Sequence, residues 1–183
     1  MSDNSKPNFD KMTFDHVGIS QEHHEVHEGD HYFTRNWDTI ATSGVPTYFS
    51  ITTPNSSSYA HLIFSVTADN LIEMEEWEGA TIYSGVSLNL FNSNRNSANT
   101  CGCIVKQNVI ISGATPTSGT LLARSRFGVA GLNPTKQGIV GNESRSYELI
   151  LKSGTTYLWQ FKPGADTVIL NWDAHWYEHI NKI

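Results

Sequence analysis

The chain has 183 residues, enough for one domain with a substantial hydrophobic core, and its formal net charge is −6. Only 16% of its residues are charged, and its lysines and arginines form no run, so the electrostatic signature of a nucleic-acid-binding protein is missing. It lacks the apolar stretch of a secretory signal, and its apolar runs are too short to cross a bilayer. We therefore expect a soluble protein, made in the cytoplasm, that binds neither nucleic acid nor a membrane.

The first 22 residues are polar and differ in character from the rest. Phe9, Met12 and Phe14 are apolar side chains that can anchor this segment to another surface. We interpret residues 1–22 as an N-terminal arm and residues 23–183 as one β-sandwich domain.

Histidines gather just after the arm, where residues 27–31 read His-Glu-Gly-Asp-His and fit the H-E-x-x-H pattern of zinc proteases. That chemistry needs a helix, which places both histidines on one face, one turn apart. Gly29 and Asp30 are poor residues for the middle of a helix. On a strand, which we consider more consistent with this sequence, His27 and His31 would lie ~13 Å apart. We therefore expect no catalytic zinc here.

Other metal-binding combinations of these histidines stay open. His23 or His24 could share a site with His27 if residues 20–28 form a helical turn. The simpler interpretation is that these histidines are exposed polar residues that lead into the first strand. We expect the purified protein to hold no stoichiometric metal and no cofactor.

Strands are predicted from residue 48 onwards, because apolar residues alternate with polar ones in six separate segments. Turn sequences rich in Pro, Gly, Asn and Ser lie between these segments. The pattern predicts an all-β protein of about eight to ten strands, an antiparallel β-sandwich or jelly roll. The alternating apolar sets are Phe49 and Ile51; Leu62, Phe64, Val66 and Ala68; Val86, Leu88 and Leu90; Tyr147, Leu149 and Leu151; Tyr157, Trp159 and Phe161; and Val168, Leu170, Trp172, Ala174 and Trp176.

Residues 70–77 allow either a helix or a strand, and we favour a strand because the surrounding segments are all β. Four glutamates fall here, at Glu73, Glu75, Glu76 and Glu78. Paired carboxylates are what a glycosidase needs. A run of this kind is more typical of a solvated sheet edge that discourages aggregation.

Cys101 and Cys103 are separated by one residue, a spacing at which a disulfide would be strained. Two ligands cannot close a zinc site alone, so we expect two reduced, partly buried thiols. The G-x-S-x-G and phosphate-binding glycine motifs do not occur. The sequence therefore predicts no catalytic residues and a protein that is not an enzyme.

The segment from Ser112 to Ser146 interrupts the alternation and is rich in glycine. We predict a long loop that acts as a functional or assembly element, although a plain surface loop is the simple alternative. Arg124 and Arg126 share a face if this segment is extended, and arginine is favoured where a cation meets carboxylates at an interface. Together with Phe9 and Phe14, they are the predicted contacts with a partner protein or with another subunit.

Several segments together, in their order and spacing, resemble small structural proteins of tailed bacteriophages. The likeness covers residues 22–179. The segments are Glu25–Tyr32, similar to the strand that opens those proteins; Pro54-Asn55 followed by Ala60–Phe64; Asn92–Thr100, similar to their N-R-N-S-A-N-T turn; Tyr157–Trp159; and Asn171–Glu178.

The resemblance implies a virion protein on the exterior of the phage head, a decoration or cement protein that binds and stabilises the assembled capsid. Its partners would then be the major capsid protein and copies of itself, and we expect a homotrimer. The resemblance implies no catalytic residues. The alternative function is a carbohydrate-binding module of a phage tail or fibre, in which an exposed tryptophan stacks on a sugar. The candidates are Trp77, Trp159, Trp172 and Trp176.

Overall fold

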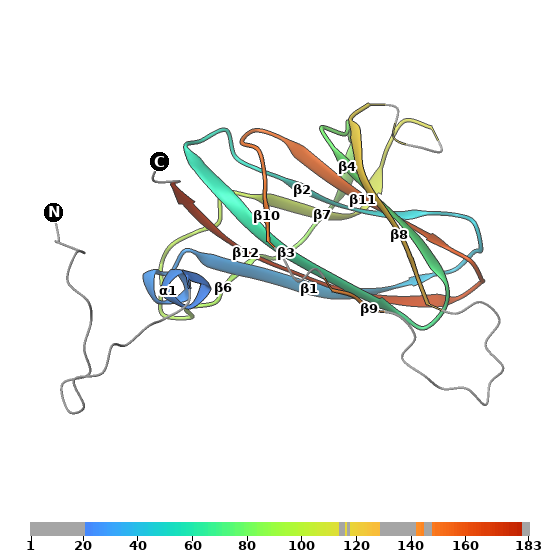
Figure 1. Cartoon of the computed structure of the whole chain (residues 1–183), viewed down its shortest axis with the longest axis horizontal. Coiled ribbons are helices and arrows are strands. Elements are labelled where there is room, and N and C mark those ends of the chain that lie inside the picture. Colours follow the sequence, from blue (N-terminus) through green and yellow to red (C-terminus); the bar gives the residue numbers. More distant parts are fainter. Residues whose placement is uncertain (1–20, 114–115, 117, 129–141, 145–147, 181–183) are drawn as a thin grey trace, which may run out of the picture.

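The computed structural model describes residues 21–113, 116, 118–128, 142–144 and 148–180. Two antiparallel sheets pack face to face, and one short helix lies beside one end of them (Figure 1). The β12 sheet has the strand order β10-β3-β12-β1-β6, with β9 also paired to β3, and the β11 sheet has the order β5-β7-β2-β11-β4-β8. The elements are α1 (Gln21–Glu28), β1 (His31–Ile40), β2 (Thr47–Thr52), β3 (Ser58–Ala68), β4 (Ile72–Glu78), β5 (Ser84–Ser87), β6 (Phe91–Asn92), β7 (Ile104–Ile110), β8 (Thr120–Phe127), β9 (Asn142–Ser144), β10 (Leu149–Ile150), β11 (Thr156–Pro163) and β12 (Val168–Ile180).

The predicted all-β sandwich is confirmed. The described residues form twelve strands where eight to ten were expected, and three of the twelve, β6, β9 and β10, are only two or three residues long. Residues 70–77, which allowed a helix or a strand, form most of β4, as favoured. The arm of residues 1–20 lies outside the described residues, and residues 21 and 22 begin α1.

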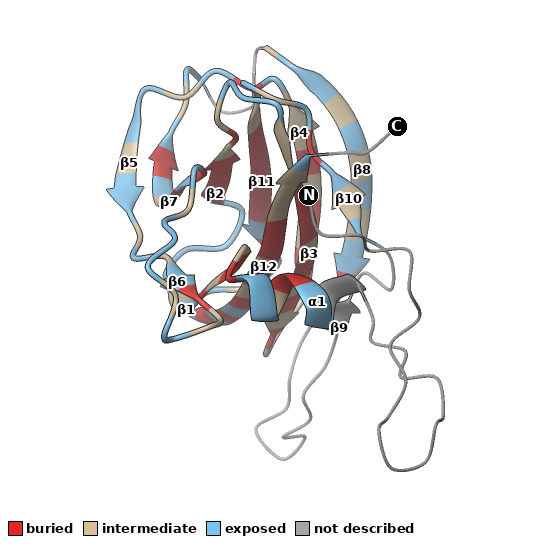
Figure 2. Ribbon diagram, turned by 90° about the vertical axis from the view of Figure 1, so that its left-hand side faces the viewer, coloured by how far each residue is buried: buried red, intermediate tan, exposed pale blue. Residues whose placement is uncertain are grey.

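The core between the sheets is built by the alternating apolar residues. In β12, every second side chain from Val168 to Trp176 is at most 4% exposed. Aromatic rings interlock across the two sheets: the Phe49 ring lies 4.5 Å from that of Trp172, and the rings of Phe64 and Trp159 lie 5.0 Å apart. Figure 2 shows the result: buried residues gather in β2, β3, β11 and β12, whereas β5 and β8 are mostly exposed. This packing explains why the period-two pattern predicted the fold.

A second, smaller cluster lies on the outer side of the β11 sheet. Tyr157 and Trp159 belong to the core between the sheets, so Leu158, which stands between them on β11, points outward. It is nevertheless fully buried, together with Tyr48, Val109 and Ala80. The cover comes from residues 79–83, which must cross this side because β4 and β5 are separated in the sheet by β11, β2 and β7.

The prediction of one long loop over residues 112–146 is wrong for its central part. Residues 120–127 form β8, the last strand of the β11 sheet, which pairs with β4. β4 is therefore not the sheet edge that its glutamates suggested. β8 ends at Gly128, whose φ is +86° and where a Cβ atom would lie 2.2 Å from the carbonyl oxygen of Asn70. Only glycine fits this turn.

Candidate functional site

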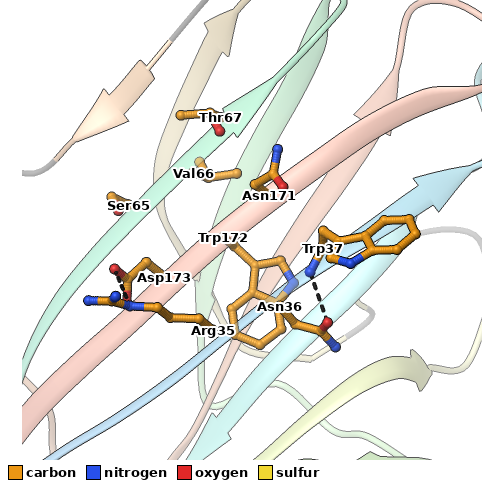
Figure 3. Close-up of a pocket in the computed structure, with 9 residues that line it drawn as sticks. All are labelled: Arg35, Asn36, Trp37, Ser65, Val66, Thr67, Asn171, Trp172 and Asp173. Atoms are coloured by element: carbon orange, nitrogen blue, oxygen red, sulfur yellow. Dashed lines mark hydrogen bonds and ion pairs between the residues drawn. The ribbon is translucent and has the colours of Figure 1, made fainter. Parts of the chain in front are cut away.

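A shallow groove of about 410 Å³ lies on the outer side of the β12 sheet. It is lined by residues of three adjacent strands, β1, β12 and β3 (Figure 3). The strand register places them in rows across the sheet. Trp37 is opposite Asn171, which is opposite Thr67, and the next row is Arg35, Asp173 and Ser65. Asn36, Val66 and Trp172 complete the lining.

Trp37 is the most exposed aromatic residue of the groove, with 63% of its surface accessible. Its backbone N–H donates to Oδ1 of Asn36 at 2.9 Å. Beside it, Arg35 Nε and Asp173 Oδ2 form an ion pair at 2.9 Å, drawn as a dashed line in Figure 3. The site thus combines an accessible indole with a charge-balanced polar row.

The tryptophans predicted to stack on a sugar are not exposed, with one partial exception. Trp159, Trp172 and Trp176 are at most 4% exposed and belong to the core, so that role is wrong for them. Trp77 is partly buried against the outer cluster of the β11 sheet. Trp37 was missed, although the sequence held a signal: it alternates with the buried Tyr32 and Thr34 on β1 and shares the side of Arg35.

The predicted contact residues Arg124 and Arg126 do share one face, because β8 is extended. Both are paired within the chain. Arg124 Nε lies 2.8 Å from Oε1 of Glu75, and Arg126 pairs with Glu73. The Arg126 hydrogen bond and charge lower the pKa of Glu73 from its ordinary value. Phe9 and Phe14, the other predicted contacts, lie outside the described residues.

The H-E-x-x-H segment is divided between two elements. His27 and Glu28 end α1, and His31 begins β1, so the expectation that this whole segment is extended is wrong. The helix ends at Gly29, whose φ is +83° and whose N–H donates to the Glu25 carbonyl at 3.1 Å. The two pattern histidines are therefore not one helical turn apart, and the zinc-protease arrangement is not formed.

The helical turn does bring His23 and His27 together, as one open alternative required. Their Nε2 atoms are 3.1 Å apart on the exposed side of α1. A hydrogen bond between two imidazoles needs one ring to donate and the other to accept. The 3.1 Å distance fits such a hydrogen bond.

A second polar cluster lies on the outer side of the β12 sheet, at the end near α1, and was not predicted. His61 Nδ1 and Tyr177 Oη bind the two carboxylate oxygens of Glu148, at 2.9 and 2.5 Å. Nε2 of His61 lies 3.1 Å from Nε2 of His179. Burial alone would raise the pKa of Glu148, but the hydrogen bonds from Tyr177 and His61 outweigh it and lower the pKa. His61 and Tyr177 are buried, so this cluster is a structural network.

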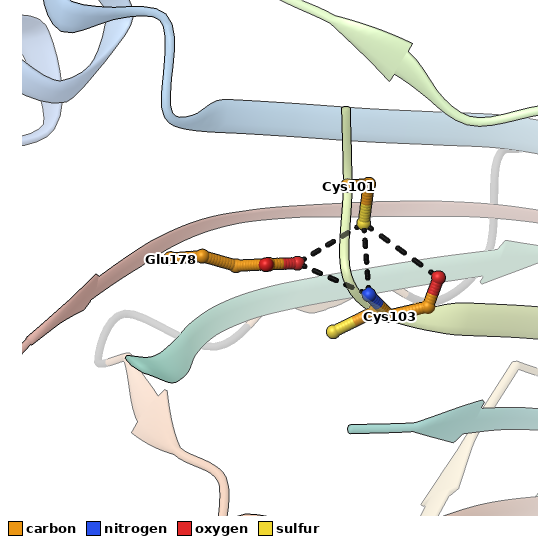
Figure 4. A group of neighbouring side chains, drawn as sticks. All are labelled: Cys101, Cys103 and Glu178. Carbon is orange, nitrogen blue, oxygen red and sulfur yellow. Dashed lines mark hydrogen bonds between the residues drawn. The ribbon is translucent and has the colours of Figure 1, made fainter. Parts of the chain in front are cut away.

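Cys101, Cys103 and Glu178 form the group most like a metal site in the part of the chain that the structure describes (Figure 4). One possible ligand atom from each lies within 4.8 Å of the others. However, the carboxylate already accepts hydrogen bonds from the Cys101 thiol at 3.0 Å, the Trp176 indole at 3.1 Å, and the backbone N–H groups of Gly102 and Cys103.

The cysteine chemistry supports a structural role for this group. Both thiols are free, one partly and one fully buried, as predicted. The Cys101 thiol, burial and the Glu178 charge all raise the pKa of Cys103, so its sulfur stays protonated at neutral pH. The hydrogen bonds that Glu178 accepts from the Cys101 thiol and from the backbone of Gly102 and Cys103 fasten residues 101–103 to β12.

Three segments distant in the sequence, residues 25–32, 92–100 and 171–178, meet at this end of the sandwich. The Asn92 side chain donates to the Gly29 carbonyl at 2.6 Å, and the Asn99 side chain to Oδ1 of Asp30 at 3.0 Å. The backbone N–H of Glu178 donates to the Asp30 carbonyl at 2.9 Å. These residues hold the α1–β1 turn in place, so the three segments form a structural joint.

No protein-family model, curated protein or solved structure matches the chain. Among the residues that the structure describes, no helix has the length and apolar character needed to cross a membrane.

Proposed function

We propose that this protein is a virion structural protein of a tailed bacteriophage, a head decoration protein that binds and stabilises the assembled capsid from outside. The resemblance supports this proposal through several segments in a characteristic order. Three of these segments contact one another in the fold, as expected if they were retained as one structural unit. The major capsid protein is the proposed partner.

The observation that carries the proposal is the exposed edge strand β8. Among the described residues it pairs with β4 alone and ends the β11 sheet. Its exposed side chains alternate along Thr120, Leu122, Arg124 and Arg126. An edge strand offers unpaired backbone groups to another chain, and arginines offer planar donors to carboxylates.

The internal ion pairs of β8 do not prevent such a contact. The side chains of Arg124 and Arg126 stay 69% and 65% exposed while paired. Ion pairs between exposed side chains contribute roughly 0–1 kcal/mol, so exchanging one carboxylate for another costs little. The pairs with Glu75 and Glu73 hold the guanidinium groups in place along the edge.

The test is cosedimentation of the purified protein with shells that lack their decoration protein. The wild type should pellet with the shells, and Arg124→Ala with Arg126→Ala should weaken binding about tenfold through loss of interfacial charge pairs. Arg35→Ala is the matched control, because Arg35 is 68% exposed and ion-paired but lies on the other sheet. If the wild type does not bind, the proposed function is wrong. If the wild type binds and the double arginine variant binds equally well, the contact surface lies elsewhere.

The N-terminal arm is the second proposed contact, through Phe9 and Phe14. Deleting residues 1–18 should leave the far-ultraviolet circular dichroism of the sandwich unchanged and weaken shell binding. Unchanged affinity of the deletion variant would exclude the arm from the interface.

The proposed assembly state is a homotrimer, as the resemblance implies, because shell decoration proteins commonly sit at local threefold positions. Light scattering of the free protein and mass measurement on the particle test this. A monomer in both conditions would contradict it.

A further inference from the structure

We propose that the groove on the outer side of the β12 sheet binds a neutral oligosaccharide, with Trp37 as the stacking platform. The proposal does not depend on the capsid function, because the groove and β8 lie on different sheets.

Trp37 presents the kind of surface that a sugar ring covers. It is 63% exposed although it lies inside a ten-residue strand, and its backbone is fixed by the ladder to Asn171 on β12. A pyranose has one face of C–H groups that can lie against the flat indole, which removes apolar area from water. A rigid strand carries the ring, so little conformational entropy is lost on binding.

The polar residues beside Trp37 suit the hydroxyl groups of such a ring. Arg35 offers donors, Asp173 offers acceptors, and Asn171 offers both. Ser65 and Thr67 add hydroxyls on the next strand. Sugar hydroxyls both donate and accept, so a fixed row containing both kinds of partner recognises them better than a row of one kind.

The charge of the groove favours a neutral ligand. The Arg35 guanidinium is paired with the Asp173 carboxylate at 2.9 Å, so neither side chain presents an unbalanced charge. The whole chain has a formal net charge of −6, which disfavours acidic polysaccharides.

The shape of the groove favours a chain rather than a small enclosed molecule. Its volume of about 410 Å³ lies within the range of small-ligand sites. All nine lining residues come from three neighbouring strands, so one sheet forms the whole described lining of the groove. An oligosaccharide that lies on this sheet can therefore extend past the ends of the groove.

Affinity electrophoresis tests the proposal with native gels that contain a neutral polysaccharide, laminarin or galactomannan, or an acidic one, alginate or hyaluronan. We expect at least one neutral polysaccharide to retard the wild type and the acidic ones not to. Trp37→Ala should weaken the retarding interaction about tenfold, and Trp37→Tyr should retain most of it. Tyr83→Ala is the matched control, because Tyr83 is 68% exposed but lies outside the groove.

Asn171→Ala is the second groove variant and should also weaken retardation. Thermal unfolding of each variant identifies any loss due to misfolding, which is not expected at exposed positions. The assignment is wrong if neither neutral polysaccharide retards the wild type, if the acidic ones retard it instead, or if Tyr83→Ala loses as much as Trp37→Ala. Shell cosedimentation of Trp37→Ala should be normal, which separates this result from the capsid proposal.

Discussion

Both sheets carry large apolar side chains on their outer sides, yet the one at the centre of the β11 sheet is covered and the one on β1 of the β12 sheet is open. On the β11 sheet, Leu158 points away from the core between the sheets and is still 0% exposed, because residues 79–83 cross over it. On the β12 sheet, Trp37 also points outward and is 63% exposed. Strand alternation decides the side on which a residue lies, whereas the chain connections decide whether that side is buried.

The largest expected effect is the difference in stability between two truncations, Leu158→Ala at the covered position and Trp37→Ala at the open one. Leu158→Ala should lower the free energy of unfolding by about 2–5 kcal/mol, as in a hydrophobic core, because it leaves a cavity under residues 79–83. Trp37→Ala should change it by less than about 0.5 kcal/mol, although the side chain removed is larger. Urea denaturation measures both values. Similar losses in the two variants would remove the distinction between the covered and the open side.

The same distinction explains how far the sequence could predict this molecule. Alternation identified the inward residues of β3, β11 and β12, since their burial depends on a local period of two. It could not predict that Leu158 is buried, because its cover comes from a crossing connection set by the strand order. β8 was missed for a related reason: an edge strand has few buried side chains, and its partners on β4 are distant in sequence.

The candidate sites were harder to predict than the fold. Four tryptophans were named as sugar platforms, and three of them are core residues, because aromatic content alone does not separate buried from exposed rings. Trp37 could have been found by following the alternation of β1 from Tyr32. The cluster of Glu178 with Cys101 joins residues 77 positions apart, and only the register of the sheets brings them together.

The polar cluster of His61, Glu148 and Tyr177, at the α1 end of the β12 sheet, offers the next test. Tyr177 is 3% exposed and donates to Glu148 at 2.5 Å, so Tyr177→Phe leaves a charged acceptor without this donor. We expect a loss of about 1–3 kcal/mol in the free energy of unfolding. Tyr83→Phe, at an exposed position, should lose almost nothing. A loss in Tyr177→Phe as small as that in Tyr83→Phe would mean that the hydrogen bond from Tyr177 to Glu148 does not stabilise the fold.

The pH dependence of stability compares one carboxylate from each sheet. Hydrogen bonds from Lys152 and Tyr157 lower the pKa of Glu78 on β4 below its ordinary 4.5. For Glu148, burial opposes the lowering by Tyr177 and His61. A lowered folded-state pKa stabilises the protein above the unfolded-state pKa, and the stabilisation is lost as the pH falls through the folded-state value.

The free energy of unfolding should therefore decline as the pH falls from about 6 to about 3, and less steeply in either glutamine variant. We expect Glu78→Gln and Glu148→Gln each to flatten the profile, because each substitution removes a carboxyl whose pKa is lowered in the folded state. Urea denaturation at intervals of pH measures this. Profiles of both variants parallel to that of the wild type would contradict the assigned shifts.

The smallest expected effect concerns two ion pairs that match in geometry and lie on opposite sheets. Arg35 with Asp173 and Arg124 with Glu75 have nitrogen–oxygen distances of 2.9 and 2.8 Å, and their arginines are 68% and 69% exposed. A double-mutant cycle for each pair, with alanine at either or both positions, should give a coupling energy of about 0.2–1 kcal/mol. The value should fall in about 1 M salt, where the Debye length is only about 3 Å. A coupling above about 2 kcal/mol in either pair would mean that the pair is needed for folding. Weak coupling in both pairs would mean that these arginine substitutions leave the sandwich little changed. Any loss of shell binding or polysaccharide binding in such variants would then reflect lost contacts with the ligand.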